Sequence, residues 1–127
     1  MKKKTIPLIL LATFFAIVAS VAYAHEKVKL TGYVVDVMCA ADHTKDSAED
    51  AMKFASEHDK SCGLMEACVK SGYGIFADGK WHPFDAKGNE MAKAIFEKTR
   101  KNDHIKVTVE GMKHAGQILV EKMTEEQ

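Results

Sequence analysis

The chain has 127 residues, of which 46% are hydrophobic and 28% are charged, and its 18 basic side chains are balanced by 18 acidic ones. A length of this order suits one small domain with a modest core rather than two domains. The balanced charge, with no basic run beyond the first residues, excludes a typical nucleic-acid-binding surface.

The first 24 residues have the pattern of a secretory signal peptide. Lys2–Lys4 form a positive segment, Ile6–Val21 is a nearly unbroken apolar run, and Ala22-Tyr23-Ala24 supplies the small residues of a cleavage site. A retained membrane anchor is the alternative, because the apolar run approaches the length that spans a bilayer. We favour cleavage, a periplasmic or otherwise exported location, and no stable membrane insertion afterwards. The remaining domain, residues 25–127, would carry a net charge of −3 and so have no attraction to anionic lipid.

The exported part is predicted to begin with a long strand. Lys27–Met38 is rich in β-branched and aromatic residues. Val28 and Leu30 share one face, whereas the apolar positions from Tyr33 onward have the opposite phase. The phase changes at Gly32, which predicts a bulge or a sharp bend there.

Residues 42–72 are predicted to form a helical insertion after this strand. Ser47 followed by Asp50 resembles a capping box, and the apolar spacing beyond it predicts an amphipathic helix to about His58. A second short helix is predicted over Ser61–Lys70. The insertion therefore carries two of the three cysteines and two of the six histidines.

The segment Tyr73–Asp85 carries the clearest hairpin pattern in the chain. Asp78-Gly79 favours a two-residue turn of type I′ between two β-prone runs. The resulting register places Ile75 opposite His82.

The C-terminal part predicts one helix and two further strands. Asn89 is a candidate N-cap for a helix that continues to about Lys101. Alternation over Ile105–Glu110 predicts a half-buried strand, and Gln117–Met123 a last strand after a turn. Five strands with a helix between the third and fourth is the order of the OB-fold. We therefore predict an α+β domain, a five-stranded OB-like partly open barrel with a helical insertion after the first strand.

Three cysteines lie within 30 residues, so the chain has either one free thiol beside a disulfide or a site that uses all three sulfurs. Disulfides are chemically possible in an exported domain of this size. Cys62 and Cys68 in one helix would have Cα atoms about 9 Å apart, too far for a disulfide. Cys39 and Cys68 are the better pair, because Cys68 lies on the apolar stripe of its helix.

The same stretch offers the ligands of a soft metal ion. Cys39 and His43 are four residues apart, as are His58 and Cys62, and Cys68 adds a third sulfur. Cysteine and histidine in this combination are typical of structural zinc sites. The sequence therefore also predicts a metal site made of these five residues.

Other residues near the cysteines bear on the identity of the metal. Met38 and Met65 adjoin cysteines, and thioether with thiolate favours copper(I), so zinc and copper both stay open. Asp36 and Asp42 could orient a histidine ligand, although both are equally ordinary at strand ends and turns.

The remaining histidines are weaker candidates. His82 is expected to be a packing residue, and His104 and His114 are expected in solvated loops. His25 differs, because cleavage after Ala24 would make it the first residue. Its amine and imidazole could then chelate copper, provided that the fold supplies a second histidine.

Catalytic patterns are missing from the sequence. It contains no nucleophile elbow, no phosphate-binding glycine loop and no orienting third group beside a Cys–His pair. The chain is therefore not expected to be an enzyme.

Several stretches resemble a family of small, exported, largely uncharacterised bacterial proteins. They are Gly32–Cys39, Ser61–Gly74, Asp78–Lys80, Phe84-Asp85 and Val107–Gly111, with Ser61–Gly74 the specific part. Ala40 departs from the glycine that many such proteins carry there. The family is similar to periplasmic OB-fold domains, so the resemblance implies fold and compartment and brings no established activity. Such domains as a class tend to bind small ligands or cations.

The main functional prediction is a non-enzymatic exported domain that binds zinc or copper at Cys39, His43, His58, Cys62 and Cys68. The first alternative is a disulfide-stabilised module that binds a small ligand or a protein partner on a face made by Tyr73, Trp81 and Phe84. The second alternative is a thiol-redox protein that acts through Cys62.

Overall fold

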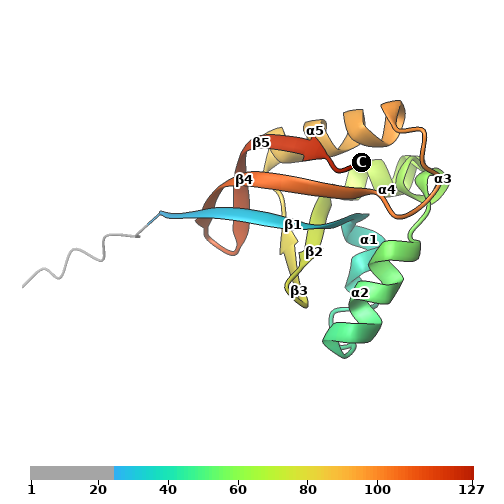
Figure 1. Ribbon diagram of the computed structural model, residues 1–127, viewed down its shortest axis with the longest axis horizontal. Helices are drawn as coiled ribbons and strands as arrows, with labels where there is room; N and C mark the ends of the chain where they lie inside the picture. The colour runs from blue at the N-terminus through green and yellow to red at the C-terminus, as the bar shows by residue number, and fades with distance from the viewer. Residues whose placement is uncertain (1–24) are drawn as a thin grey trace, which may run out of the picture.

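The computed structural model describes residues 25–127, so the predicted signal peptide lies outside the described residues. The described chain has five strands and five helices (Figure 1). The strands are β1 (Glu26–Asp36), β2 (Tyr73–Ala77), β3 (Lys80–Pro83), β4 (Lys106–His114) and β5 (Gln117–Glu125). The helices are α1 (Val37–Ala41), α2 (Ala48–Glu57), α3 (Lys60–Gly63), α4 (Glu66–Ser71) and α5 (Ala86–Lys98).

The strands form one antiparallel sheet in the order β3-β2-β1-β4-β5. β1 is central, because it pairs with β4 from Glu26 to Tyr33 and with β2 from Tyr33 to Asp36. The sheet is open, and an isolated parallel bridge between Phe84 and Ile118 brings the end of β3 to the start of β5. The predicted α+β class is confirmed, with five strands, helices after the first strand and a helix between the third and fourth.

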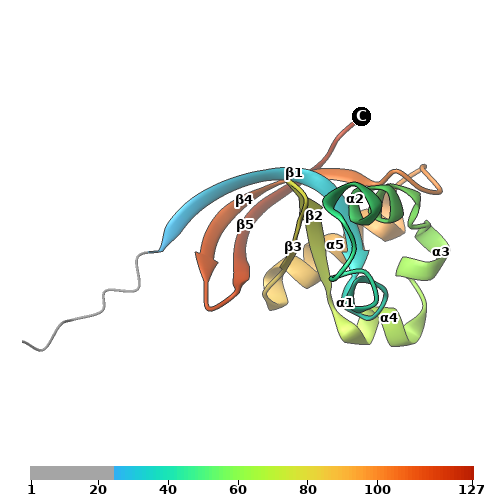
Figure 2. The same cartoon turned by 90° about the horizontal axis from the view of Figure 1, so that it is seen from below.

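Gly32 lies where β1 changes from one partner strand to the other. A Cβ at this position would lie 1.9 Å from the carbonyl oxygen of Phe76, so only glycine lets β2 approach this closely. β1 is continuous there and curves along its length, as Figure 2 shows. The irregularity in pairing lies elsewhere, between Glu110 and Gly111 on the β4–β5 ladder.

Local sequence patterns account for the hairpin and for α2. Ile75 lies opposite His82, as the Asp78-Gly79 turn predicts, and Asp78 has φ 52°. The Ser47 side chain accepts a hydrogen bond from the backbone N–H of Asp50 at 3.1 Å, which confirms the predicted cap of α2.

The predicted bounds of the other two helices are wrong. The expected helix over Ser61–Lys70 is two short helices, α3 and α4, separated at Leu64 and Met65. α5 begins after Asp85 rather than Asn89. The Asp85 carboxylate caps the helix by accepting a hydrogen bond from the backbone N–H of Gly88. It also accepts one from the backbone N–H of Val120, which joins the start of the helix to β5.

Asn89 has a different role, since its side chain accepts a hydrogen bond from the backbone N–H of Tyr73 at 2.8 Å.

Two buried clusters lie on opposite sides of the sheet. The larger one lies between the sheet and α5, which packs against β2 and β5. The smaller one lies under α1 and α2 and includes Val35, Ala40, Ala51, Ala55 and Phe76. Burial of this apolar surface is the main stabilising term for so small a domain.

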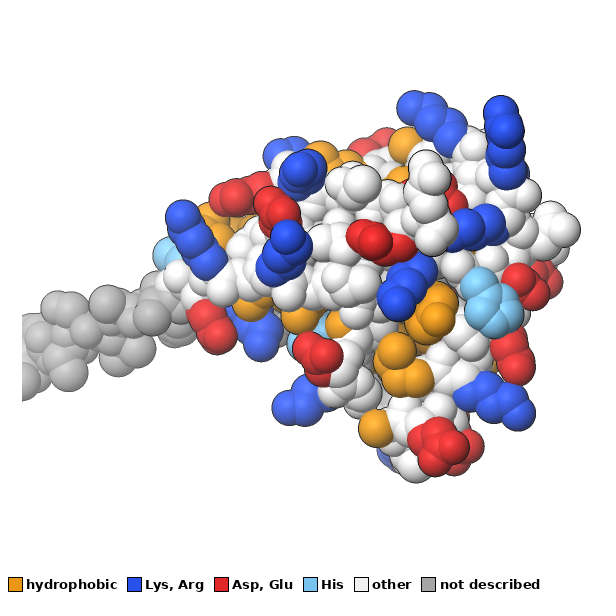
Figure 3. Space-filling model, viewed as in Figure 1, with side chains coloured by type: hydrophobic (Ala, Val, Ile, Leu, Met, Phe, Trp, Pro, Cys, Tyr) orange, Lys and Arg blue, Asp and Glu red, His pale blue; other side chains and the backbone are white. Residues whose placement is uncertain are grey.

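Among residues 25–127, the structure has no helix that is long and apolar enough to cross a membrane. On the face drawn in Figure 3, basic and acidic side chains are interspersed.

Candidate metal centre

The candidate centre is built where β1 ends and β2 begins. β1 and β2 are antiparallel neighbours, and Asp36 pairs with Tyr73 across them. α1 continues from the end of β1 and α4 leads into the start of β2, so the pairing places the two helices side by side. Cys39 on α1 and Cys68 on α4 are therefore brought together by the sheet itself.

Asp36 is the carboxylate of this centre. Its side chain is fully buried, and Oδ1 accepts a hydrogen bond from the backbone N–H of Cys39 at 2.9 Å, which caps α1. Burial alone would raise the pKa of this carboxyl group. The hydrogen bonds from His58 and from Cys39 outweigh burial and lower the pKa to about 2, so Asp36 is ionised at neutral pH.

The two thiols face this carboxylate. One ligand atom each from Asp36, Cys39 and Cys68 all lie within 4.8 Å of one another. Cys68 is buried and Cys39 is half-buried, and all three cysteines of the described chain are free thiols. The group combines two sulfurs and one carboxylate oxygen, a donor set found in zinc sites.

The thiols of this group are protonated at neutral pH. Burial and then the charge of Asp36 raise the pKa of Cys39 to about 12. The same two causes, in the same order, raise the pKa of Cys68. A reactive cysteine needs a lowered pKa, so neither thiol has the electrostatics of a nucleophile.

His58 completes the buried polar network. Its Nε2 lies 2.9 Å from Asp36 Oδ2, which assigns the ring proton to Nε2 because a carboxylate only accepts. The ring is 6% exposed and lies edge-on to Phe54 and Phe96, at centroid distances of 6.0 and 6.2 Å. Within residues 25–127, the buried Nδ1 atom has no hydrogen-bond partner. His58 therefore reaches the thiols only through Asp36.

The other two predicted ligands lie outside this group. Cys62 on α3 is half-buried, and its backbone N–H donates to Asp59 at 2.8 Å. Burial, then Asp59 and then Asp36 raise the pKa of the Cys62 thiol. His43 stacks on Phe54 at 3.6 Å, and its Nδ1 lies 2.6 Å from Asp46 Oδ2 in the loop after α1.

Sequence reasoning gave Asp36 only a supporting role, whereas the structure places it inside the group. The available signal was its position three residues before Cys39, which is the spacing of a helix N-cap. Burial of a carboxylate at a strand end depends on tertiary packing, which the local pattern does not reveal.

The predicted ligand face does not form one surface. Tyr73 is 1% exposed and Phe84 is 5% exposed, and both lie in the larger core cluster. The Tyr73 hydroxyl donates to the carbonyl oxygen of Gly63 at 2.7 Å, which satisfies it within the core. Trp81 packs against Phe76 in the other cluster. These three side chains thus belong to two different sides of the sheet.

No family model, no curated protein and no solved structure matches the chain.

Proposed function

We propose that the chain is an exported, non-enzymatic domain that binds one metal ion, zinc or copper(I), between Asp36, Cys39 and Cys68. The observation that carries the proposal is the convergence of an ionised, buried carboxylate and two thiols within 4.8 Å. Deprotonating both thiols beside Asp36 would place three negative charges in a buried space. Such a charge is tolerable only with a cation among the three groups.

The raised pKa values of the thiols set how binding depends on pH. Metal binds thiolate, so each of Cys39 and Cys68 must release a proton when the ion enters. Because burial and Asp36 raise the pKa of both thiols, both protons are present at neutral pH in the free protein. The affinity for the ion should therefore rise with pH across the neutral range.

Neighbouring side chains bear on the choice between the two ions. Zinc accepts two thiolates and a carboxylate, and water can supply the fourth ligand. Copper(I) prefers sulfur alone. Among residues 25–127, the exposed large apolar side chains are Met38 and Met65, at 52% and 57% exposure. Met38 lies on α1 beside Cys39, and Met65 is the N-cap of α4, which carries Cys68. Exposed thioethers bind copper(I) and would provide a path for it from solvent to the two thiols, which favours copper(I).

We also propose that the scaffold is an OB-like, partly open barrel. In support, the strand order is β3-β2-β1-β4-β5, with a parallel contact between the ends of β3 and β5 and a helix between β3 and β4. An OB barrel is a five-stranded, partly open Greek-key barrel.

A disulfide between Cys39 and Cys68 is the second candidate, supported by the same proximity of the two sulfurs. It would covalently join α1 to α4 and leave Cys62 as the free thiol. A thiol-redox function through Cys62 is less well supported, because burial and Asp59 raise rather than lower the pKa of that thiol.

Metal analysis with thiol counting separates these candidates. We would purify residues 25–127 after export, measure bound zinc and copper, and count free thiols after removing metal with a chelator. The proposal expects one ion per chain and three free thiols. One free thiol, a mass lower by two hydrogens and no bound ion would overturn it in favour of the disulfide.

Matched serine variants locate the ion. Cys39→Ser and Cys68→Ser should each lower zinc and copper(I) affinity by at least about tenfold, the smallest loss that follows even from removing an outer-shell partner of a metal ligand. His104→Gln changes an exposed histidine outside the Asp36, Cys39 and Cys68 group and serves as the control, with unchanged affinity. Equal affinity in all four proteins would contradict the proposed site.

A further inference from the structure

His25 and His114 face each other across the first positions of the β1–β4 ladder. Glu26 pairs with Lys113, so the antiparallel register puts His25 opposite His114. Their ring centroids are 4.9 Å apart with an interplanar angle of 20°. The pair lies at the opposite end of β1 from Asp36, which is about 35 Å away along an extended strand of this length.

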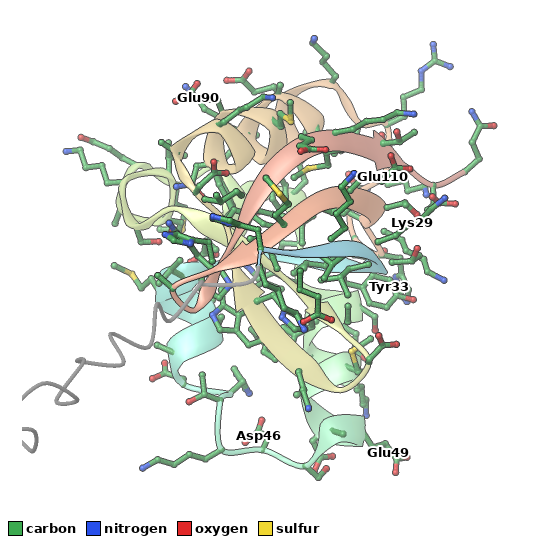
Figure 4. The ribbon with its side chains drawn as sticks, turned by 90° about the vertical axis from the view of Figure 1, so that its left-hand side faces the viewer. Lys29, Tyr33, Asp46, Glu49, Glu90 and Glu110 are labelled. Carbon is green, nitrogen blue, oxygen red and sulfur yellow. The ribbon has the colours of Figure 1, made fainter. Side chains whose placement is uncertain are left out.

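Alternation along the strands places both imidazoles on one face of the sheet. Side chains two apart on a strand share a face, so His25 lies with Lys27 and Lys29, and His114 lies with Met112 and Glu110. Figure 4 shows Lys29 and Glu110 on this face, and their charged groups are 3.6 Å apart. The two histidines continue the same cross-strand row to the end of the ladder.

Two imidazoles on directly opposed strand positions can hold one ion between them. Their Cβ atoms are about 4.5–5.5 Å apart in such a pair, and a metal–imidazole bond is about 2 Å long. The nitrogen lone pairs lie in the ring planes, so both side chains must turn out of the stacked arrangement to bring one nitrogen of each ring to a shared ion.

The predicted export adds a third nitrogen at the same place. If cleavage follows Ala24, His25 carries the α-amine of the exported chain, and an amine and an imidazole of one residue form a chelate. We propose that this amine, the His25 ring and the His114 ring bind copper(II) at the start of β1, as a second site separate from the Cys39–Cys68 centre. The proposal rests on the proposed export and cleavage, and it does not depend on the thiols.

The surroundings of His114 suit an ion with an open coordination position. His114 lines a hollow of about 300 Å³ together with His82, Lys113 and the turn over residues 115–118. Water or a small anionic or neutral ligand in that hollow would lie beside His114. Three nitrogen donors with an open position favour copper(II) over magnesium or calcium, which prefer oxygen.

The test uses copper(II) itself as the probe, with glycine as competitor. To silence the first site, the protein is residues 25–127 carrying Cys39→Ser and Cys68→Ser, beginning with His25. We expect one tightly bound copper(II) per chain and nitrogen hyperfine coupling in its electron paramagnetic resonance spectrum. In the same background, His114→Gln should lower the affinity by at least about tenfold.

Two matched proteins isolate the remaining ligands. A chain that retains residues 19–24 moves the free amine away from the His25 ring and should also lose at least about tenfold in affinity. His104→Gln, which changes an exposed histidine outside the pair, should bind copper(II) as the parent does. The inference is overturned if the His114→Gln or extended chain binds as tightly as the parent, or if sequencing of the exported protein finds a first residue other than His25. Neither result affects the thiol centre, which is measured separately with zinc and copper(I).

Discussion

The carboxylate of Asp36 and the imidazole of His58 form a buried pair, with 2.9 Å between Oδ2 and Nε2 and almost no exposure of either side chain. Asp36 is the last residue of β1 and His58 is the residue that ends α2. The pair therefore ties the helical insertion to the central strand at the candidate metal centre. It also holds the carboxylate in place against the two thiols, which is what a preorganised ligand requires.

The lowered pKa of Asp36 predicts a loss of stability in acid. The carboxyl group binds its proton less tightly in the folded protein, where its pKa is about 2, than in the unfolded chain, where the ordinary value is 3.8. The stabilising contribution is therefore complete above about pH 4 and disappears as pH falls through 2. The shift corresponds to about 2 kcal/mol.

Asp36→Asn should remove this acid dependence, because asparagine keeps the cap of α1 without a titrating group. Urea unfolding at pH 5 and at pH 2.5 measures the difference between the two proteins. Asp46→Asn, a change at an exposed carboxylate, is the control and should retain the dependence of the parent. An unchanged acid dependence in Asp36→Asn would show that other carboxylates cause it.

His58 is expected to stabilise the fold by donating a hydrogen bond to a buried carboxylate. His58→Leu leaves Asp36 buried and without its partner, which should lower the free energy of unfolding by about 3–5 kcal/mol. His58→Gln places an amide N–H near the position of Nε2 and should recover about half of that loss. Denaturant unfolding at pH 7 measures both, and equal losses in the two variants would contradict the proposed pairing.

Alkylation at neutral pH should distinguish the three cysteines. Cys68 is 4% exposed and the pKa of Cys39 is raised to about 12, so both should react slowly with iodoacetamide. Cys62, on the short helix α3, should react first. Peptide mapping after timed quenching gives the order, and added zinc should slow Cys39 and Cys68 further. Labelling in denaturant, where all three should react alike, is the control.

Gly32 is expected to be intolerant of any side chain. A Cβ would meet the carbonyl oxygen of Phe76 at 1.9 Å, so Gly32→Ala must displace β2 from β1 and should cost about 2–4 kcal/mol. Gly116→Ala is the matched control. Its φ of 79° strains alanine by about 1–2 kcal/mol, but no atom within 4 Å of its Cβ opposes it. Thermal unfolding should rank Gly32→Ala as the less stable variant, and the reverse order would contradict the role of Gly32.

The parts of the fold that local patterns encode were predictable. The Asp78-Gly79 turn and its flanking alternation gave the register of the β2–β3 hairpin, and Ser47 gave the start of α2. The start of α5 could not be predicted from the local pattern. The carboxylate of Asp85 is held at the helix start by the backbone N–H of Val120 on β5, 35 residues further along the chain. The break between α3 and α4 was missed because the apolar stripe of Ser61–Lys70 runs across it.

The candidate site was predictable to a similar extent. Spacing pointed to Cys39 and Cys68, and their meeting follows from the pairing of β1 with β2. The spacing of Cys39 and His43 predicted that the two side chains meet near the end of the first strand, but α1 ends at Ala41 and His43 stacks on Phe54. Asp36 was undervalued because its burial is set by α1 and α2 packing over the sheet, which no local pattern encodes.

X-ray absorption spectroscopy of the metal-loaded protein tests the central claim most directly, because it identifies the atoms bound to the ion. With zinc, residues 25–127 should show at least two sulfur ligands at about 2.3 Å and an oxygen or nitrogen ligand at about 2.0–2.2 Å. The Cys39→Ser protein should lose sulfur from this shell. A shell made only of oxygen and nitrogen in the parent protein would contradict a metal centre at Asp36, Cys39 and Cys68.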